Sequence, residues 1–148
     1  MGVKINLDGL LKVEKELNYI QSHRIKVGVL GDGTGEGGKS VQEYAMYVEY
    51  GTSTIPRRPF FRKEMVTARA KKEITDYMNN LIGNVCNGSL TGAQFWNSVG
   101  LYCKARVIKS IKNGGWAANA TSTLKYKDGS QPLINTGTLV DSIDFEVI

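Results

Sequence analysis

Residues 44–62 read YAMYVEYGTSTIPRRPFFR, and this segment constrains the structure of the chain more than any other. An apolar helical pattern ends at Gly51, which fits the position after a helix where a left-handed backbone favours glycine. Pro56 and Pro59 fix their own φ angles and push the residues before them toward extended geometry. Pro59 also suits the first turn of a new helix, because an N–H group is not needed there. The segment therefore predicts a helix, a stiff elbow and a second helix.

The elbow carries two cations and is followed by two aromatic rings. Arg57 and Arg58 lie between the prolines, so the elbow is expected to present two guanidinium groups. Phe60 and Phe61 come next and are expected to anchor the second helix, with at least one ring in the core. Nothing in this arrangement resembles a catalytic constellation.

The same segment resembles a motif of phage tail-completion and head–tail connector proteins, A-x-x-x-E-[FY]-G-T-x-x-[IM]-P-x-R-P-F-[FL]-R. The residues that match it are Ala45, Glu49, Tyr50, Gly51, Thr52, Ile55, Pro56, Arg58, Pro59, Phe60, Phe61 and Arg62. The glycine, prolines and phenylalanines of the motif have the structural roles given above, so the motif describes a helix–elbow–helix unit.

A second motif of these families is matched roughly fifty residues further on. It consists of a Trp, a Thr-x-x-x-Lys segment and the pattern P-L-x-x-T-G-x-L-x-x-S-I-x-[YF]-x-V. The matching residues are Trp116, Asn119, Thr121, Lys125, Pro132, Leu133, Thr136, Gly137, Leu139, Ser142, Ile143, Phe145 and Val147. Two motifs in the same order make the resemblance specific, although the segments that carry them span only about a third of the chain.

The resemblance implies a structural protein and not an enzyme. It implies a virion-assembly protein of a tailed phage or prophage that completes the tail or joins head to tail as a ring-forming neck component. Its partners would be copies of itself, in a hexameric ring set by tail symmetry, and other phage neck or tail proteins. Such a protein would assemble in the cytoplasm of the bacterial host and function in the virion. Which neck layer it forms stays open.

The chain of 148 residues is expected to form a single domain, residues 1–148, which is long enough to bury a core. No apolar run is long enough to span a membrane, so no membrane partner is expected. Cys86, Cys103 and His23 are the only residues of their kinds, an inventory too small for a metal site. Both thiols are expected to be buried and reduced. No catalytic residue, cofactor or metal is predicted.

The net charge of +5 is concentrated in the middle of the chain. Residues 57–72 hold seven basic side chains and one acid, and residues 77–127 hold six basic side chains and no acid. A nucleic-acid surface is one explanation, which would allow non-specific proximity to DNA. Contact between oppositely charged surfaces of neighbouring copies is another. A solvated helix face is the third, and the sequence does not choose among them.

Hydrophobic periodicity predicts a helical middle with a strand near each end. Helices are expected over residues 8–21, 41–50, 59–83, 91–113 and 136–142, and strands over residues 24–30 and 143–148. Residues 116–135 are expected to be irregular or to form a hairpin. Capping boxes at Ser40/Glu43 and Thr91/Gln94 mark two of the helix starts. Because βαβ alternation is absent, the pattern favours an α+β fold with a small antiparallel sheet and helices packed on one face.

Residues 33–40, GTGEGGKS, match the phosphate-binding pattern G-x-x-x-x-G-K-[ST] between a predicted strand and a helix. Three features oppose a nucleotide site: no acid ends an apolar strand to hold Mg²⁺, parallel strands are too few, and Glu36 would enter the phosphate nest. The alternative is a flexible glycine loop that becomes ordered against a neighbouring subunit, in which Gly33, Gly35 and Lys39 make the contact.

The predicted oligomer interface combines the elbow and the glycine loop. Its members on one copy are Arg57, Arg58, Gly33, Gly35 and Lys39. They are expected to meet acids such as Glu14, Glu16 or Glu43 on the next copy. A structural role is assigned to Gly51, Pro56, Pro59, Phe60, Phe61, Trp116 and Gly137. One alternative also stays open at Tyr44, Tyr47 and Tyr50, which share a helix face and either pack in the core or form an aromatic contact stripe.

Overall fold

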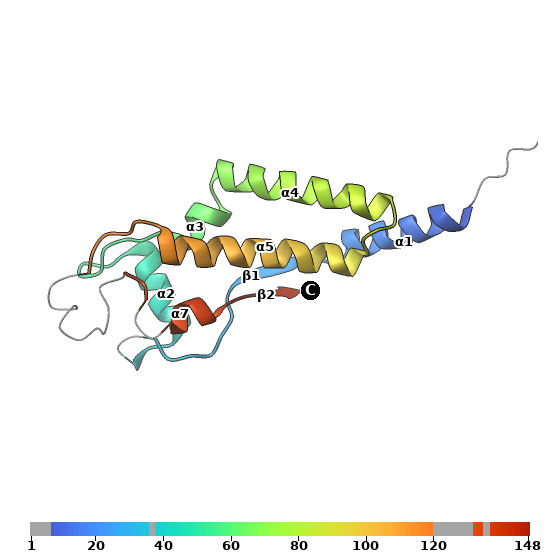
Figure 1. The fold of residues 1–148 in the computed structure, drawn as a ribbon. Coiled ribbons are helices and arrows are strands. Elements are labelled where there is room, and N and C mark those ends of the chain that lie inside the picture. Colours follow the sequence, from blue (N-terminus) through green and yellow to red (C-terminus); the bar gives the residue numbers. More distant parts are fainter. Residues whose placement is uncertain (1–6, 36–37, 120–131, 135–136) are drawn as a thin grey trace, which may run out of the picture.

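The computed structural model describes residues 7–35, 38–119, 132–134 and 137–148. Six helices and two strands lie within these ranges (Figure 1). In chain order they are α1 (Leu7–Ser22), β1 (Ile25–Val29), α2 (Val41–Tyr50), α3 (Phe60–Met65), α4 (Ala68–Cys86), α5 (Gly92–Asn113), α7 (Thr138–Asp141) and β2 (Ile143–Val147). The hairpin or irregular segment expected over residues 116–135 falls largely outside the described residues.

The two strands form one antiparallel sheet, which confirms the expected pairing of the two ends of the chain. Ile25 lies opposite Val147, and Val29 lies opposite Ile143. These alternating apolar residues face the helices, because such a strand buries every second side chain. The other face carries the exposed side chains Lys26, Asp144 and Glu146. The fold is therefore α+β, with helices packed against the sheet, as predicted.

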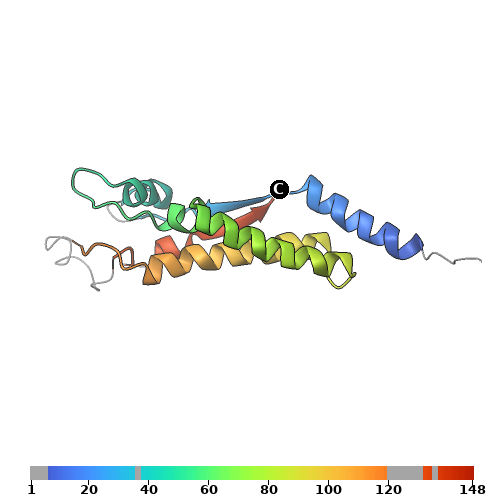
Figure 2. The same cartoon turned by 90° about the horizontal axis from the view of Figure 1, so that it is seen from above.

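Helix α5 is the central element and lies beside the sheet in both views (Figures 1 and 2). Gly100 allows this close approach, since a Cβ atom there would lie 2.1 Å from Cδ2 of Phe145. Any larger residue would push the helix away from β2. The predicted capping box at the start of α5 is confirmed: Thr91 Oγ1 accepts from the Gln94 N–H at 3.2 Å, and Gln94 Oε1 accepts from the Thr91 N–H at 3.0 Å.

The core consists of two clusters arranged along α5. In the first, Val107 and Ile111 of α5 meet Phe60 of α3 and the inner face of α2. In the second, Phe95 and Val99 of α5 meet the end of α4. The first cluster also buries Leu133, which has a φ of 67° that leucine rarely adopts. The two clusters make the molecule long, with α2 at one end and α1 at the other (Figure 1).

The helix expected over residues 59–83 is in fact two helices. α3 ends at Met65, and α4 begins at Ala68 after Thr67, whose hydroxyl accepts from the Ala70 N–H at 3.2 Å. Thr67 is thus an N-cap, a local signal that competes with continued helix. Pro59 lies at the N-cap position of α3 and not within its first turn. The break lets α4 turn and run along α5.

One of the two cysteines is placed differently from the expectation. Cys103 is fully buried in the second core cluster, and this burial raises the pKa of its thiol. Cys86 is exposed at the last position of α4, directly after Val85, which is buried in the second core cluster. The prediction that both thiols are buried is therefore wrong for Cys86.

Helix α1 forms where the sequence predicts it, but most of it is uncovered. None of its residues is buried, and Leu10, expected to face inward, is 62% exposed. In both views the N-terminal half of α1 extends beyond the rest of the molecule (Figures 1 and 2). Within the described ranges, no helix is both long enough and apolar enough to cross a membrane.

Candidate functional site

The end of α2 is joined to the start of α3 by the carboxylate of Glu49. This side chain is buried and accepts hydrogen bonds from the N–H groups of Phe61 and Arg62, both at 3.0 Å. The Arg62 guanidinium donates to the same carboxylate at 2.9 Å. Pro59 provides no capping side chain, so Glu49 satisfies the free N–H groups of α3 from a different helix. Glu49, which precedes the elbow in the sequence, therefore joins the helices on its two sides.

The position of Glu49 in the sequence is itself a signal for this role. Val41, Ala45, Val48 and Glu49 are the buried residues of α2. A carboxylate on the apolar face of an amphipathic helix needs a partner, because an unpaired buried charge is costly. Reading Glu49 in this way would have predicted a nearby arginine or a helix N-terminus.

Arg58 is not the exposed contact that the sequence predicts. Its side chain is buried, with the residue only 4% exposed. Its Nε donates to the carbonyl of Ala117 at 2.9 Å, and Nη2 donates to Ala118 O at 3.3 Å and to Asn119 Oδ1 at 3.2 Å. A guanidinium offers several donors in a fixed plane, so one buried arginine can bind several acceptors of the same segment. Arg58 therefore ties the elbow to the segment after α5 and is removed from the predicted interface.

Arg57 remains on the surface at the tip of the elbow. It lies against Gly51, which has a φ of 77°, and a Cβ atom on Gly51 would come within 3.1 Å of the Arg57 backbone. Pro56 beside it is exposed as well. The predicted anchor is confirmed for Phe60, which is 1% exposed, while Phe61 is half-buried against the same cluster. The elbow thus presents one arginine and buries the other.

The described part of the glycine loop packs against the molecule. A Cβ atom on Gly33 would lie 2.7 Å from Cγ2 of Thr138, and one on Gly35 would lie 2.9 Å from Cβ of Tyr44. These two glycines face α7 and α2 of the same molecule, and their place at an interface with another copy stays a prediction. Lys39 is exposed, as predicted. Residues 36 and 37 lie outside the described ranges.

The backbone of this loop also differs from a phosphate cradle. The Gly35 N–H donates to Lys39 O at 2.7 Å, and the Val41 N–H donates to Gly33 O at 2.9 Å. In a phosphate-binding loop such N–H groups point at the ligand. The Lys39 ammonium donates to the Tyr47 hydroxyl at 3.1 Å and to Glu43 at 3.2 Å, and these two bonds, the first before the second, raise the pKa of Lys39. The sheet beside the loop is antiparallel.

The outward face of α2 carries exposed apolar and aromatic side chains. Met46 and Tyr50 are each 61% exposed, and Tyr47, one turn before Tyr50, is half-buried. We call these three residues the α2 patch. Arg62 lies over the ring of Tyr50, with 4.5 Å from its Cζ to the ring centroid. Tyr44 packs against the first core cluster, whereas Tyr50 faces outward. The core alternative therefore holds for Tyr44 and the surface alternative for Tyr50.

The α2 patch lies between two exposed cations. Lys39 precedes α2 and Arg57 follows it, and a ten-residue helix separates its two ends by about 15 Å. The Lys39 ammonium also lies 4.3 Å from the centroid of the Tyr47 ring. Tyrosine, methionine and arginine are enriched in the centres of protein interfaces, where they bury large surfaces at modest entropic cost. This end of the molecule is therefore the candidate interaction surface.

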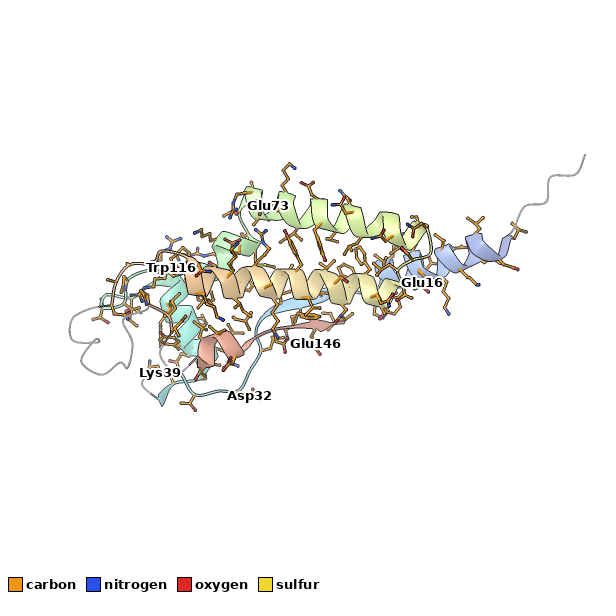
Figure 3. All side chains as sticks on the ribbon, in the orientation of Figure 1. Glu16, Asp32, Lys39, Glu73, Trp116 and Glu146 are labelled. Carbon is orange, nitrogen blue, oxygen red and sulfur yellow. The ribbon has the colours of Figure 1, made fainter. Side chains whose placement is uncertain are left out.

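Trp116 and Gly137 have the structural roles expected of them. The Trp116 indole donates to Ser110 O at 2.8 Å, which folds the chain back over the end of α5. Gly137 has a φ of 80° and precedes α7. Figure 3 shows Trp116 and Lys39 at the α2 end of the molecule and Glu16 on α1 at the opposite end.

Ion pairs compensate much of the basic middle of the chain. Arg106 binds Glu64 at 2.9 Å and Glu73 at 2.6 Å, and its hydrogen bond lowers the pKa of Glu73. The other pairs of this region are Arg62–Glu49, Arg69–Glu64, Arg69–Glu73, Lys72–Asp76 and Lys104–Asp144. These acids reduce the positive potential that a nucleic acid would meet. The structure therefore offers little support for the nucleic-acid alternative.

Comparisons with known proteins do not assign the chain to a family. No family model, curated protein or solved structure matches the sequence or the fold. Among the described residues, no three His, Cys, Asp or Glu side chains come together as a metal site would require. The resemblance carried by the two motifs stays a prediction.

Proposed function

We propose that this chain is a structural virion-assembly protein of a tailed phage or prophage. It acts in the neck or at the end of the tail as a ring component, and the sixfold symmetry of tails favours six copies. It binds copies of itself and other neck or tail proteins. The α2 patch and Arg57 form its contact surface.

The observation that supports this proposal most directly is the construction of the elbow. Glu49 and Arg58 are buried and hydrogen-bonded, so the backbone of the elbow is fixed by the molecule's own contacts. The residues that this frame presents, Met46, Tyr50 and Arg57, are exposed. A preformed surface loses little conformational freedom when it binds, which suits a subunit that joins an assembly late. The frame also gives a physical reason for the matched motif.

The experiment is complementation of a phage or prophage in which this gene is disrupted. We expect the double variant Tyr50→Ala/Arg57→Glu to fold normally and to leave heads and tails unjoined, or tails malformed, in electron micrographs. Lys71→Glu is the matched control, because Lys71 is an exposed cation on α4 away from the α2 patch. Wild-type protein should be present in purified virions. Its absence from virions, together with normal particle yield from the disrupted strain, would overturn the proposal.

A further inference from the structure

The sheet leaves one edge of each strand without a neighbouring strand. Within the described residues it consists of β1 and β2 alone. Arg24 and Ile148 exchange both backbone hydrogen bonds, at 2.7 Å and 2.9 Å, which fixes the alternation along the ladder. Every second residue therefore turns its N–H and C=O groups away from the other strand. These residues are Ile25, Val27 and Val29 on β1 and Ile143, Phe145 and Val147 on β2.

The outward backbone groups are almost entirely without partners. Among the described residues, a single hydrogen bond involves them, in which the Phe145 N–H donates to Asp144 Oδ1 at 2.9 Å. Neither strand contains a proline, and the continuous register contains no bulge, two features by which proteins block such edges. An isolated pair of strands is only marginally stable, so further pairing would stabilise this sheet. Both edges are therefore suited to accept another strand.

The exposed side chains of the two strands carry opposite charges. On the outer face of the sheet, β1 presents Arg24 and Lys26, whereas β2 presents Asp144 and Glu146. Within the described ranges, Asp144 alone of these four forms an ion pair, with Lys104 at 3.0 Å. Two β1 edges or two β2 edges would place like charges opposite each other, which destabilises a strand pair. A β1 edge beside a β2 edge instead places cations opposite carboxylates.

An exposed apolar side chain lies on the flank of α5 nearest β2. Leu101 is 53% exposed, and Lys104, one turn later on the same side of the helix, reaches Asp144 of β2. Two strands are about 10 Å wide, which is close to the diameter of a helix. A sheet continued through successive copies would thus carry one α5 per copy at ordinary helix-packing distance, and Leu101 would be covered by the next copy.

From these observations we infer that β2 of one copy pairs with β1 of a second copy of this chain, so that their sheets form one continuous antiparallel sheet. The outward groups belong to odd-numbered residues on both strands, so pairing them aligns the even-numbered residues, which carry the opposite charges. Each copy uses two different edges, as a ring requires. The inference rests on the proposed function for its setting, and it leaves the α2 patch to contact other neck or tail proteins.

Asp144 keeps this contact weak in the free subunit. Its carboxylate occupies the Phe145 N–H, which must be released before it can bind a second strand. Each strand is also only five residues long, so a single pairing buries little surface. Closure of a ring adds a further contact without the cost of bringing in another copy. The free subunit is therefore expected to be largely monomeric and to pair at high concentration.

Cross-linking between two separately labelled proteins tests the pairing. One carries Lys26→Cys and the other Glu146→Cys, both with Cys86→Ser to remove the exposed native thiol. Residues opposite each other in neighbouring strands are close enough for a disulfide. An oxidised mixture should give about fivefold more linked dimer than either protein alone. Arg24→Cys in place of Lys26→Cys covers a register shifted by two residues. Lys71→Cys is the control, because Lys71 is an exposed cation on α4.

A charge exchange tests the same contact without thiols. Lys26→Glu and Glu146→Lys should each weaken self-association about fivefold in analytical ultracentrifugation, because each places like charges opposite each other. A mixture of the two proteins should restore most of it, since β1 of the first then meets β2 of the second with opposite charges. Lys71→Glu should change nothing.

Three results would overturn the inference. Equal cross-linking by the mixture and by either protein alone would show that a strand pairs with its own kind. Absence of linked dimers from every mixture would leave the edges to a different protein. Failure of the mixed charge variants to recover would remove the opposite charges from the contact. Virions that contain the protein, together with any of these results, would refute the edge pairing and leave the proposed function standing.

Discussion

Both ends of this molecule expose large apolar side chains, but the two ends are built in opposite ways. At the α2 end, Glu49, Arg58 and Phe60 are buried, and each fixes the backbone that presents the exposed residues. At the α1 end, no residue of the helix is buried, and Leu17 and Ile20, which pack against the second core cluster, lie in its second half. The surface at the α2 end is supported by buried residues beneath it, whereas the surface at the α1 end belongs to a helix with no buried residue.

This difference matters for how the two surfaces contribute to binding. A surface fixed by buried hydrogen bonds keeps its shape in the free subunit, so its residues pay little ordering entropy on contact. A weakly held helix end has low local stability and is expected to open more often. If the two meet in an assembly, the rigid end acts as a template and the α1 end gains most of its order there. Mutations at the two ends should therefore differ in their effects on stability.

The largest contrast is expected for truncation of one apolar side chain at each end. Phe60→Ala should lower the free energy of unfolding by about 3–5 kcal/mol, because it removes a fully buried ring from the first core cluster. Leu10→Ala should change it by no more than about 0.5 kcal/mol in the monomer, since this leucine is exposed. Chemical denaturation of both variants measures the difference. Equal losses would show that α1 is buried in the free subunit and would break the comparison.

Sequence patterns predicted those parts of the fold that depend on residues close together in the sequence. The capping residues Ser40 and Thr91 and the glycine turn at Gly51 were predictable because each acts within about four residues of itself. The pairing of β1 with β2 was predictable for another reason, since two alternating segments in one chain have few other partners. Local chemistry and alternation thus account for the fold class.

The interaction surface was predicted less well, because it depends on contacts between distant segments. The place of Arg58 in the elbow between two prolines predicts an exposed contact, but its bonds to Ala117 and Asn119 join residues about sixty positions apart. No pattern near Arg58 reports those carbonyls. Glu49 was accessible to analysis, since its place on the apolar face of α2 signals a buried partner.

The second prediction uses the neighbouring arginines of the elbow. Arg58→Ala should cost about 2 kcal/mol, because it removes a buried side chain together with its hydrogen bonds to the segment after α5. Arg57→Ala should cost less than about 0.5 kcal/mol, because Arg57 is exposed. Thermal and denaturant melting of the two single variants provide the measurement. A larger loss for Arg57 than for Arg58 would show that the elbow is held from outside and not from within.

The smallest expected effect concerns the charge network on the α2 patch. The hydrogen bond from the Tyr47 hydroxyl, followed by that from Lys39, lowers the pKa of Glu43 below its usual value. Tyr47→Phe removes the first donor, so the pKa of Glu43 should rise toward the ordinary value of about 4.3, as followed by NMR titration of the carboxyl carbon. Lys39→Met should raise it as well, but by less.

The direction of the stability change follows from the same pKa. A carboxylate whose pKa is lower in the folded state stabilises the fold above its unfolded pKa and loses that contribution as the pH falls through the folded value. The Tyr47→Phe variant should therefore lose slightly less stability than the wild type between about pH 5 and 3. Because Glu43 is exposed, the change will be small, and the NMR titration is the decisive measurement. If Glu43 titrates at its usual pKa in the wild type, Tyr47 is not held in place within the free subunit. The α2 patch would then share the loose character of the α1 end, and the contrast between the two ends would reduce to the buried elbow beneath it.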